Sequence, residues 1–279
     1  MRKPVVAICY DFDKTLATDY MQNFTFVKDL GMTADEFWTK TREVQKKYEV
    51  DGALAYLFMM KEECESKGIK FTRSYLNSLG KDIVLFKGVE SWFKRMNDYA
   101  KKHNIQLEHY IISSGNKEIL EGTNIFKEFT NVFGCEYLYD ENGEVRWLKN
   151  IVNYTLKTQY LFKICKGVTD PIDESKVNEK TTKKHVEFRN MIYIGDGFND
   201  IPCMSLTKEK GGIAICVYEN GKANNAKKLV SDGRVNYACL ADYSENSEID
   251  KLIKLIIDAV SFDEELLYRE TKNHLKKIK

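Results

Sequence analysis

Short apolar runs recur along the chain, and each is followed by small or acidic residues. They lie at residues 5–10, 109–112, 191–194 and 213–217. They are rich in Val and Ile and apolar on both faces, which is typical of strands buried inside a parallel sheet. Amphipathic helical patterns lie between them, at residues 89–103, 155–166 and 249–260. Strands that alternate with helices predict an α/β fold with a mainly parallel sheet.

The segment from residue 16 to about residue 85 breaks this alternation, because its pattern is almost wholly helical. Thr33 and Glu36 have the spacing of a capping box, in which each side chain bonds the backbone amide of the other residue. The helix that follows should end near Tyr48, a second should cover residues 53–67, and Thr72 could cap a third. We therefore expect a core made of residues 1–17 and 86–279, interrupted by a helical insertion of residues 18–85.

Two further segments depart from the alternation of strands and helices. Residues 132–139 and 144–147 have strand-like patterns, and the Asn142-Gly143 pair between them is a strong signal for a hairpin turn. We expect this β-hairpin to form a flap beside the core. Residues 170–185 are polar and charged, so they predict a surface excursion.

The composition of the 279-residue chain narrows the class of protein. It is 43% hydrophobic and 30% charged, so it can bury a sizeable core and is not a disordered tail. Its 43 basic residues are balanced by 42 acidic residues, and without a basic excess we expect no nucleic-acid partner. Seven scattered cysteines without a CxxC pair argue against a disulfide framework or a zinc site. No run is long enough for a secretory signal or a membrane span, so we expect a cytoplasmic protein without a membrane partner.

Two acidic residues follow the first apolar run. Asp11 and Asp13 stand at the carboxyl end of a predicted buried strand, where open α/β sheets bind their ligands. Two carboxylates so close together repel each other unless a cation lies between them or one holds a proton. Mg²⁺ suits such a site, because it prefers carboxylate, carbonyl and phosphate oxygens. The simpler alternative is a turn after a strand, where Asp is common.

A second acidic group follows the run at residues 191–194, within the sequence Gly195-Asp196-Gly197-Phe198-Asn199-Asp200. The two glycines allow a sharp turn and a close approach to a ligand. Asp196 could bind a metal ion, and Asp200 could hold a metal-bound water or a neighbouring lysine. A helix-capping loop without a ligand is the alternative, and it loses weight because two separate strands end in carboxylate pairs.

Phosphate-binding groups are expected at two more places. The run at residues 109–112 leads into Ser113, Ser114 and Gly115, whose hydroxyls and amides at a helix start could bind phosphate oxygens. Ser is also a common helix N-cap, so this signal is weak by itself. Lys157 lies in the first turn of a predicted helix and could reach a phosphoryl group, although a surface lysine is the simpler interpretation.

Taken together and in this order, the four segments resemble the motifs of the haloacid dehalogenase (HAD) superfamily of phosphohydrolases. The first motif corresponds to Asp11-Phe12-Asp13-Lys14-Thr15, the second to Ser113, the third to Lys157 and the fourth to residues 195–200. Ser114 is an alternative for the second motif, and Lys163 and Lys166 are alternatives for the third. The positions of the helical insertion and the hairpin resemble the phosphoserine-phosphatase-like branch. The resemblance implies a Rossmann-like core of three layers with an inserted helical cap.

The resemblance also implies a catalytic role for three residues. Asp11 would be the nucleophile that forms an aspartyl-phosphate. Asp13 would protonate the leaving oxygen and later activate water. Lys157 would bind the phosphoryl group and counter the charge of Asp11, because a carboxylate attacks an anionic phosphate poorly unless that charge is cancelled.

The remaining matched residues would bind the metal and the phosphate. Mg²⁺ would be held by a carboxylate oxygen of Asp11, the backbone carbonyl of Asp13 and the carboxylate of Asp196. Asp200 and Asn199 would hold these metal ligands in position. The substrate phosphate would be bound by Ser113, Ser114, Gly115 and Lys157.

The second acidic residue of the first motif favours phosphate chemistry, because dehalogenases of the superfamily generally lack the residue that stands here as Asp13. We therefore expect a phosphatase that hydrolyses a phosphomonoester of a small metabolite. A phosphotransferase or phosphomutase on the same core and a non-catalytic phosphate-binding regulator are the alternatives.

The substrate and the oligomeric state stay open at this point. The branch places a Glu shortly after the first motif to meet a substrate amine, and here only Asp19 or Gln22 could take its place. Arg42 and Arg73 could meet a substrate carboxylate, although a surface position is the simpler interpretation for each.

Overall fold

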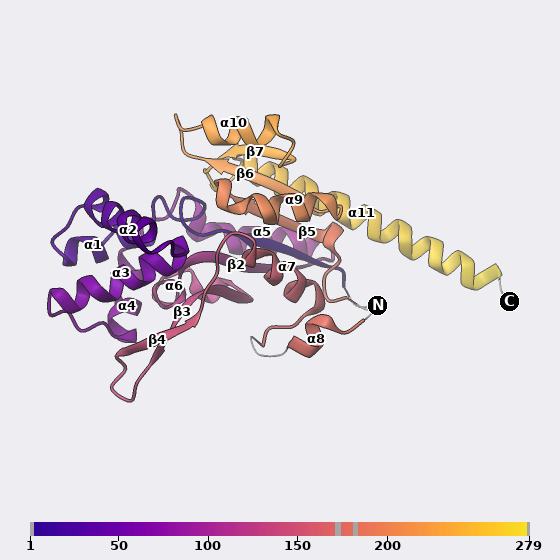
Figure 1. Ribbon diagram of the computed structural model, residues 1–279. Coiled ribbons are helices and arrows are strands. Elements are labelled where there is room, and N and C mark those ends of the chain that lie inside the picture. The colour runs from indigo at the N-terminus through magenta and orange to yellow at the C-terminus, as the bar shows by residue number, and fades with distance from the viewer. Residues whose placement is uncertain (1–2, 171–173, 181–183, 278–279) are drawn as a thin grey trace.

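The fold is built on one seven-stranded sheet that lies between helices (Figure 1). The computed structural model describes residues 3–170, 174–180 and 184–277. The strand order is β4-β3-β2-β1-β5-β6-β7, and every pair of neighbours is parallel except β3 and β4. The strands are β1 (Val5–Tyr10), β2 (Gln106–Asn116), β3 (Asn131–Tyr139), β4 (Val145–Asn150), β5 (Met191–Gly195), β6 (Ile213–Tyr218) and β7 (Tyr237–Leu240). The α/β fold with a mainly parallel sheet is confirmed.

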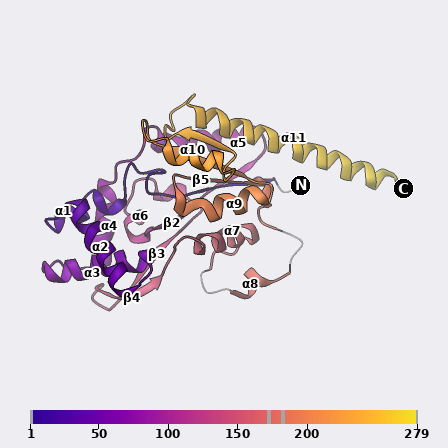
Figure 2. The same cartoon turned by 45° about the horizontal axis from the view of Figure 1, so that its top comes forward.

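Helices cover both faces of this sheet, which gives the expected three layers. Helix α5 packs with α11 on one face of the sheet. Helix α7 packs with α9 on the opposite face (Figures 1 and 2). The core helices are α5 (Val89–Lys102), α6 (Lys117–Glu121), α7 (Leu156–Lys166), α8 (Glu174–Asn178), α9 (Ile201–Glu209), α10 (Asn224–Ser231) and α11 (Glu248–Lys277). Strands β1 and β5 are buried along their whole length, as their unbroken apolar runs predict.

The helical insertion follows β1 directly. It contains α1 (Phe26–Asp29), α2 (Ala34–Tyr48), α3 (Gly52–Ser66) and α4 (Arg73–Leu79). The capping box at the start of α2 is present, because Thr33 and Glu36 bond each other's backbone amides. Thr72 caps α4 as expected, through the amide of Tyr75. Helical structure in this segment is therefore as predicted, while the division of the chain into two domains near residues 17 and 86 stays a prediction.

The expected hairpin is formed by β3 and β4, and its turn places Gly143 in the left-handed region, at φ 76°. Its first strand also pairs in parallel with β2, so the hairpin is continuous with the main sheet. Its far end contacts the insertion, where the amide of Val145 donates to the carbonyl of Phe71 and that of Arg73 to the carbonyl of Gly143. The hairpin therefore connects the sheet to the insertion and is tied at both ends.

The C-terminal region joins two segments, residues 249–260 and a basic tail over residues 264–279, that the sequence predicted as separate helical stretches. Residues 249–260 and the tail after them form one helix, α11, because neither Gly nor Pro interrupts the sequence there. This helix runs beyond the edge of the sheet in both views (Figures 1 and 2). Strand β7 was not expected, since it has only four residues and two of them are exposed. Within the predicted surface excursion at residues 170–185, residues 171–173 and 181–183 lie outside the described residues, and α8 lies between them.

All seven cysteines are buried with free thiols. Over the ranges that the structure covers, none of the helices combines the length and the apolar character needed to cross a membrane.

Candidate active site

The first motif continues directly from β1 into a tight turn. Asp11 is 8% exposed, and its amide donates to the carbonyl of Ile194 on β5, which ties the ends of the two strands together. The carboxylate of Asp13 accepts a hydrogen bond of 2.9 Å from the amide of Met21 in the insertion. Between Asp13 and Thr15, Lys14 has φ 58°, a left-handed conformation that a residue with a side chain adopts only under constraint.

Lys157 reaches the acidic residues from the first turn of α7. Its Nζ lies 2.8 Å from Asp11 Oδ1 and 2.7 Å from Asp200 Oδ1, and the side chain is 1% exposed. The alternative lysines lie elsewhere: Lys166 donates to the carbonyl of Glu179, and Lys163 lies over the ring of Tyr160. Of the three lysines that the sequence left open, Lys157 is the one that the fold places at Asp11.

The fourth motif turns sharply after β5. Asp200 is fully buried, and its Oδ1 accepts a second hydrogen bond of 2.8 Å from the hydroxyl of Tyr193. Gly195 is required because a Cβ there would lie 2.5 Å from Asp200 Oδ2. Of the two partners that the sequence allowed for Asp200, the structure shows the lysine. Asn199 is exposed on the short helix η5 (Phe198–Asp200).

Three carboxylates converge at these strand ends. One oxygen from each of Asp11, Asp196 and Asp200 lies within 4.8 Å of the others. Burial, together with the Asp200 charge, raises the pKa of Asp11 to about 6 against the opposing effect of Lys157. Burial and the charges of Asp200 and Asp11 raise the pKa of Asp196 to about 8. Burial would lower the pKa of Lys157, but the Asp11 and Asp200 carboxylates raise it well above its usual value.

This donor set fits a divalent cation. Three carboxylates facing one lysine leave an excess of negative charge in a buried place, and hard oxygen ligands are those that Mg²⁺ binds. Asp11 and Asp196 belong to the sequence-predicted metal set. The third carboxylate of the cluster is Asp200 rather than Asp13, for which the resemblance implied the backbone carbonyl. Burial and the adjacent Asp11 charge raise the pKa of Asp13 well above its usual value.

The second motif lies within the last residues of β2, beside β1 in the sheet. Ser113 is fully buried, and its Oγ accepts a hydrogen bond of 3.0 Å from the amide of Gly115. The Ser114 carbonyl accepts a bond of 2.5 Å from the hydroxyl of Tyr56 on α3. A Cβ on Gly115 would lie 3.3 Å from Asp13 Oδ2, so this segment lies against the first motif. Which hydroxyl binds phosphate stays a prediction.

The insertion contributes contacts that sequence reasoning did not find. The side-chain amide of Gln22 is buried and donates to Asn116 Oδ1, 3.1 Å away. The hydroxyl contacts of Tyr56 on α3 and of Tyr193 on β5 were not predicted, because each is an aromatic in an apolar stretch and no motif marks its hydroxyl. Arg73 instead pairs with Glu121, and Arg42 lies near Asp35, so neither is placed at Asp11.

Comparisons with known proteins agree with this geometry. Residues 6–234 match the model of the family described as "Putative Phosphatase". An uncharacterized protein of Borreliella burgdorferi is 26% identical, over 89% of this chain and 95% of that protein.

Solved structures show the same fold. A HAD family hydrolase of Salmonella enterica serovar Typhi has a TM-score of 0.58 at 16% identity, with 90% of this chain and 70% of that chain covered. A phospho-aspartyl intermediate analogue of phosphoserine phosphatase has a TM-score of 0.53 at 15% identity, covering 91% and 99%. A substrate-bound phosphoserine phosphatase gives 0.55 at 14%, also covering 91% and 99%. With the match of the family model to most of its length, this chain belongs to the phosphatase family described as "Putative Phosphatase" and has the fold of the HAD hydrolases.

Proposed function

We propose that the chain is a Mg²⁺-dependent phosphomonoester hydrolase that acts on a small phosphorylated metabolite through an aspartyl-phosphate. The observation that carries this proposal is the position of Lys157, which bonds Asp11 and Asp200 beside the carboxylate of Asp196. A buried lysine at the carboxyl ends of parallel strands can hold both the nucleophile and an incoming anion. An ion pair that only stabilised the fold would not need Asp196 as a third carboxylate beside Asp11 and Asp200.

The reaction divides into two displacements. In the first, a carboxylate oxygen of Asp11 bonds to phosphorus while the bond from phosphorus to the leaving oxygen breaks, and Asp13 gives that oxygen its proton. In the second, Asp13 takes a proton from water, whose oxygen bonds to phosphorus and releases Asp11 and inorganic phosphate. The raised pKa of Asp13 fits a residue that must first hold a proton and then regain one.

The remaining groups hold the reactants in place. Asp11, Asp196 and the backbone carbonyl of Asp13 would hold Mg²⁺, whose charge offsets the repulsion between the Asp11 carboxylate and the phosphate. Asp200 orients Lys157, and Asn199 is a further supporting residue by position alone. We propose that the phosphoryl oxygens are bound by Ser113, Ser114, Gly115 and Lys157.

Substituting Asp11 tests the covalent mechanism. Asp11→Asn is expected to abolish Mg²⁺-dependent release of phosphate from a generic phosphomonoester, and Asp232→Asn, at an exposed carboxylate, is the matched control. Wild-type protein stopped with acid during turnover of a ³²P-labelled substrate should carry an acid-stable, hydroxylamine-sensitive label that the Asp11 variant lacks. Unchanged hydrolysis by Asp11→Asn would refute the mechanism, and label passed to an added alcohol instead of water would indicate a phosphotransferase.

A further inference from the structure

The turn that carries Asp13 is constrained by neighbours on several sides. Its left-handed Lys14, at φ 58°, needs surrounding contacts to persist. The amides of Leu16 and Ala17 donate back to the carbonyl of Phe12 and close the turn from within. The carbonyl of Thr15 takes no part in these bonds, and Thr15 itself is fully buried.

A residue from the far end of the chain satisfies that carbonyl. The hydroxyl of Tyr243 donates to the Thr15 carbonyl at 2.8 Å, across 228 positions of sequence. Tyr243 is fully buried, and it follows β7 in the segment that leads into α11. A buried carbonyl that loses its donor is costly, so this single hydroxyl matters to the turn two residues from Asp13.

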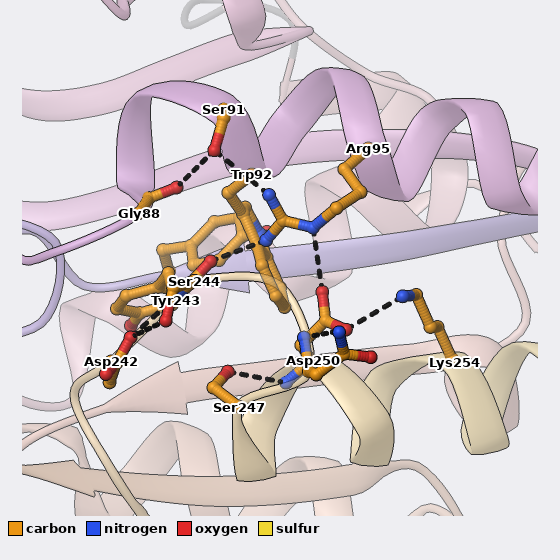
Figure 3. Close-up of polar contacts among 12 residues, drawn as sticks. Gly88, Ser91, Trp92, Arg95, Asp242, Tyr243, Ser244, Ser247, Asp250 and Lys254 are labelled. Carbon is orange, nitrogen blue, oxygen red and sulfur yellow. Dashed lines mark hydrogen bonds and ion pairs between the residues drawn. The ribbon is translucent and has the colours of Figure 1, made fainter.

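Contacts of its ring, its amide and its carbonyl fix Tyr243 in place (Figure 3). Its ring packs edge to face on Trp92, with centroids 5.2 Å apart. Its amide donates to the carbonyl of Lys87, and its carbonyl accepts a bond of 2.5 Å from Arg95. Gly88, at φ 84°, presses against the peptide that follows, since a Cβ there would lie 2.2 Å from the Ser244 amide.

Arg95 links this anchor to the C-terminal helix. Its Nε donates to Asp250 Oδ1 at 2.8 Å, and Lys254 donates to the other oxygen of that carboxylate. Figure 3 shows Arg95 extending from α5 toward Tyr243 and Asp250 together. The start of α11 and the first half of α5 therefore fix the backbone of Tyr243.

We propose that Tyr243 is a positioning residue for the reaction, acting through Thr15 to hold the turn that presents Asp13. This inference rests on the proposed function. The hydroxyl of Tyr243 reaches the turn through the backbone carbonyl of Thr15. Its effect is on the placement of the proton donor, and small errors of placement slow proton transfer strongly.

The test is Tyr243→Phe, which keeps the ring on Trp92 and removes only the hydroxyl. We expect kcat for an alkyl phosphomonoester to fall about tenfold with KM within about twofold of wild type. For p-nitrophenyl phosphate kcat/KM, which reports the first displacement and not the later attack of water in which Asp13 also acts, should fall less than about threefold, because that leaving group departs without a proton. Amide hydrogen exchange at Leu16 and Ala17 should become faster. Tyr237→Phe, at an exposed tyrosine on β7, is the matched control and should change none of these values.

Arg95→Gln provides a second route if the Phe variant does not fold, since it removes the donor to the Tyr243 carbonyl and should shift the same quantities in the same direction. Equal losses of kcat/KM on both substrates, or unchanged kcat and kcat/KM whether or not exchange is faster, overturn the proposal. The exchange measurement needs no turnover. If the wild-type protein hydrolyses nothing, the proposed function fails and exchange alone decides whether Tyr243 holds the turn.

Discussion

Two buried groups of charges differ in how their charge is balanced: one lies at the carboxyl ends of the strands, and the other lies between α5 and α11. The carboxylate cluster consists of Asp11, Asp196 and Asp200 with Lys157. The Asp250 cluster consists of Asp250 with Arg95 and Lys254. Asp200 and Asp250 are both fully buried, and each cluster joins residues that are far apart in the sequence.

The pKa values of the buried carboxyl groups shift in opposite directions in the two clusters. In the carboxylate cluster three acids share one lysine, and the pKa values of Asp11 and Asp196 rise to about 6 and about 8. In the Asp250 cluster burial alone would raise the pKa of Asp250, but hydrogen bonds from Lys254 and Arg95 bring it below its usual value. Burial of charge therefore does not by itself indicate a functional site. A buried excess of carboxylates does indicate one, because it needs a bound cation to balance it.

Apart from the loss expected for Asp11→Asn, the largest expected effect follows from removing the single cation of the carboxylate cluster. Lys157→Met should lower kcat by about 100- to 1,000-fold, because the phosphoryl group and Asp11 lose the charge between them. Lys166→Met, on the same helix, should retain activity. Rates with a generic phosphomonoester and saturating Mg²⁺ provide the measurement, with circular dichroism to check folding. A loss smaller than about tenfold would show that Lys157 stabilises the fold, as the Asp250 cluster does, and has no catalytic role.

A smaller effect, on stability, is expected from the Asp250 cluster. Arg95→Met should lower the free energy of unfolding by about 2–3 kcal/mol, less than the full cost of breaking a buried pair because Lys254 still faces Asp250. Urea denaturation monitored by fluorescence would measure it. Arg269→Met, at an exposed pair with Glu265, is the matched control and should change stability by less than about 0.5 kcal/mol. An equal result for the two variants would contradict a stabilising role for the Asp250 cluster.

Sequence reasoning found one of these clusters and not the other for a physical reason. The acids at Asp11, Asp196 and Asp200 each follow a short apolar strand, and parallel strands bring their carboxyl ends to one edge of a sheet. Arg95 and Asp250 lie 155 positions apart on two helices, and neither stands in a pattern distinguishable from a solvated surface. Tyr243 is similar, because only the folded chain brings it to Thr15.

The same holds for the fold: features set by neighbouring residues were predicted, and features set by residues far apart in the sequence were not. Thr33 and Glu36 predicted the start of α2 because a capping box is complete within four residues. The hairpin was predicted from its turn, but the parallel pairing of β3 with β2 depends on strands joined through α6 and was not visible in either segment. The sequence predicted a helix over residues 249–260 and a basic helical tail over residues 264–279. It did not show that the two are one helix, α11, because the pattern of the buried face ends near Val260.

The last prediction concerns pH and metal, and its effect is expected to be the smallest. Raised pKa values in the folded state mean that the folded protein binds protons more tightly than the unfolded chain. The stability that this provides is complete below about pH 4 and is lost as pH rises through about 6 and about 8. In EDTA, Tm should therefore fall between pH 5 and pH 8. Saturating Mg²⁺ at pH 8 should raise Tm by about 5 °C, since the ion binds only the folded, ionised cluster.

Two variants connect this prediction to the comparison of the clusters. Asp196→Asn removes the acid with the higher pKa, so it should flatten the fall in Tm above pH 6 and remove most of the Mg²⁺ effect. Asp250→Asn should lower Tm at every pH above 5 and leave the Mg²⁺ increment intact, because its cluster already has excess positive charge. Scanning calorimetry on the three proteins separates these outcomes. An equal Mg²⁺ increment in wild type and Asp196→Asn would place the cation elsewhere and contradict the assignment of charge excess to the carboxylate cluster.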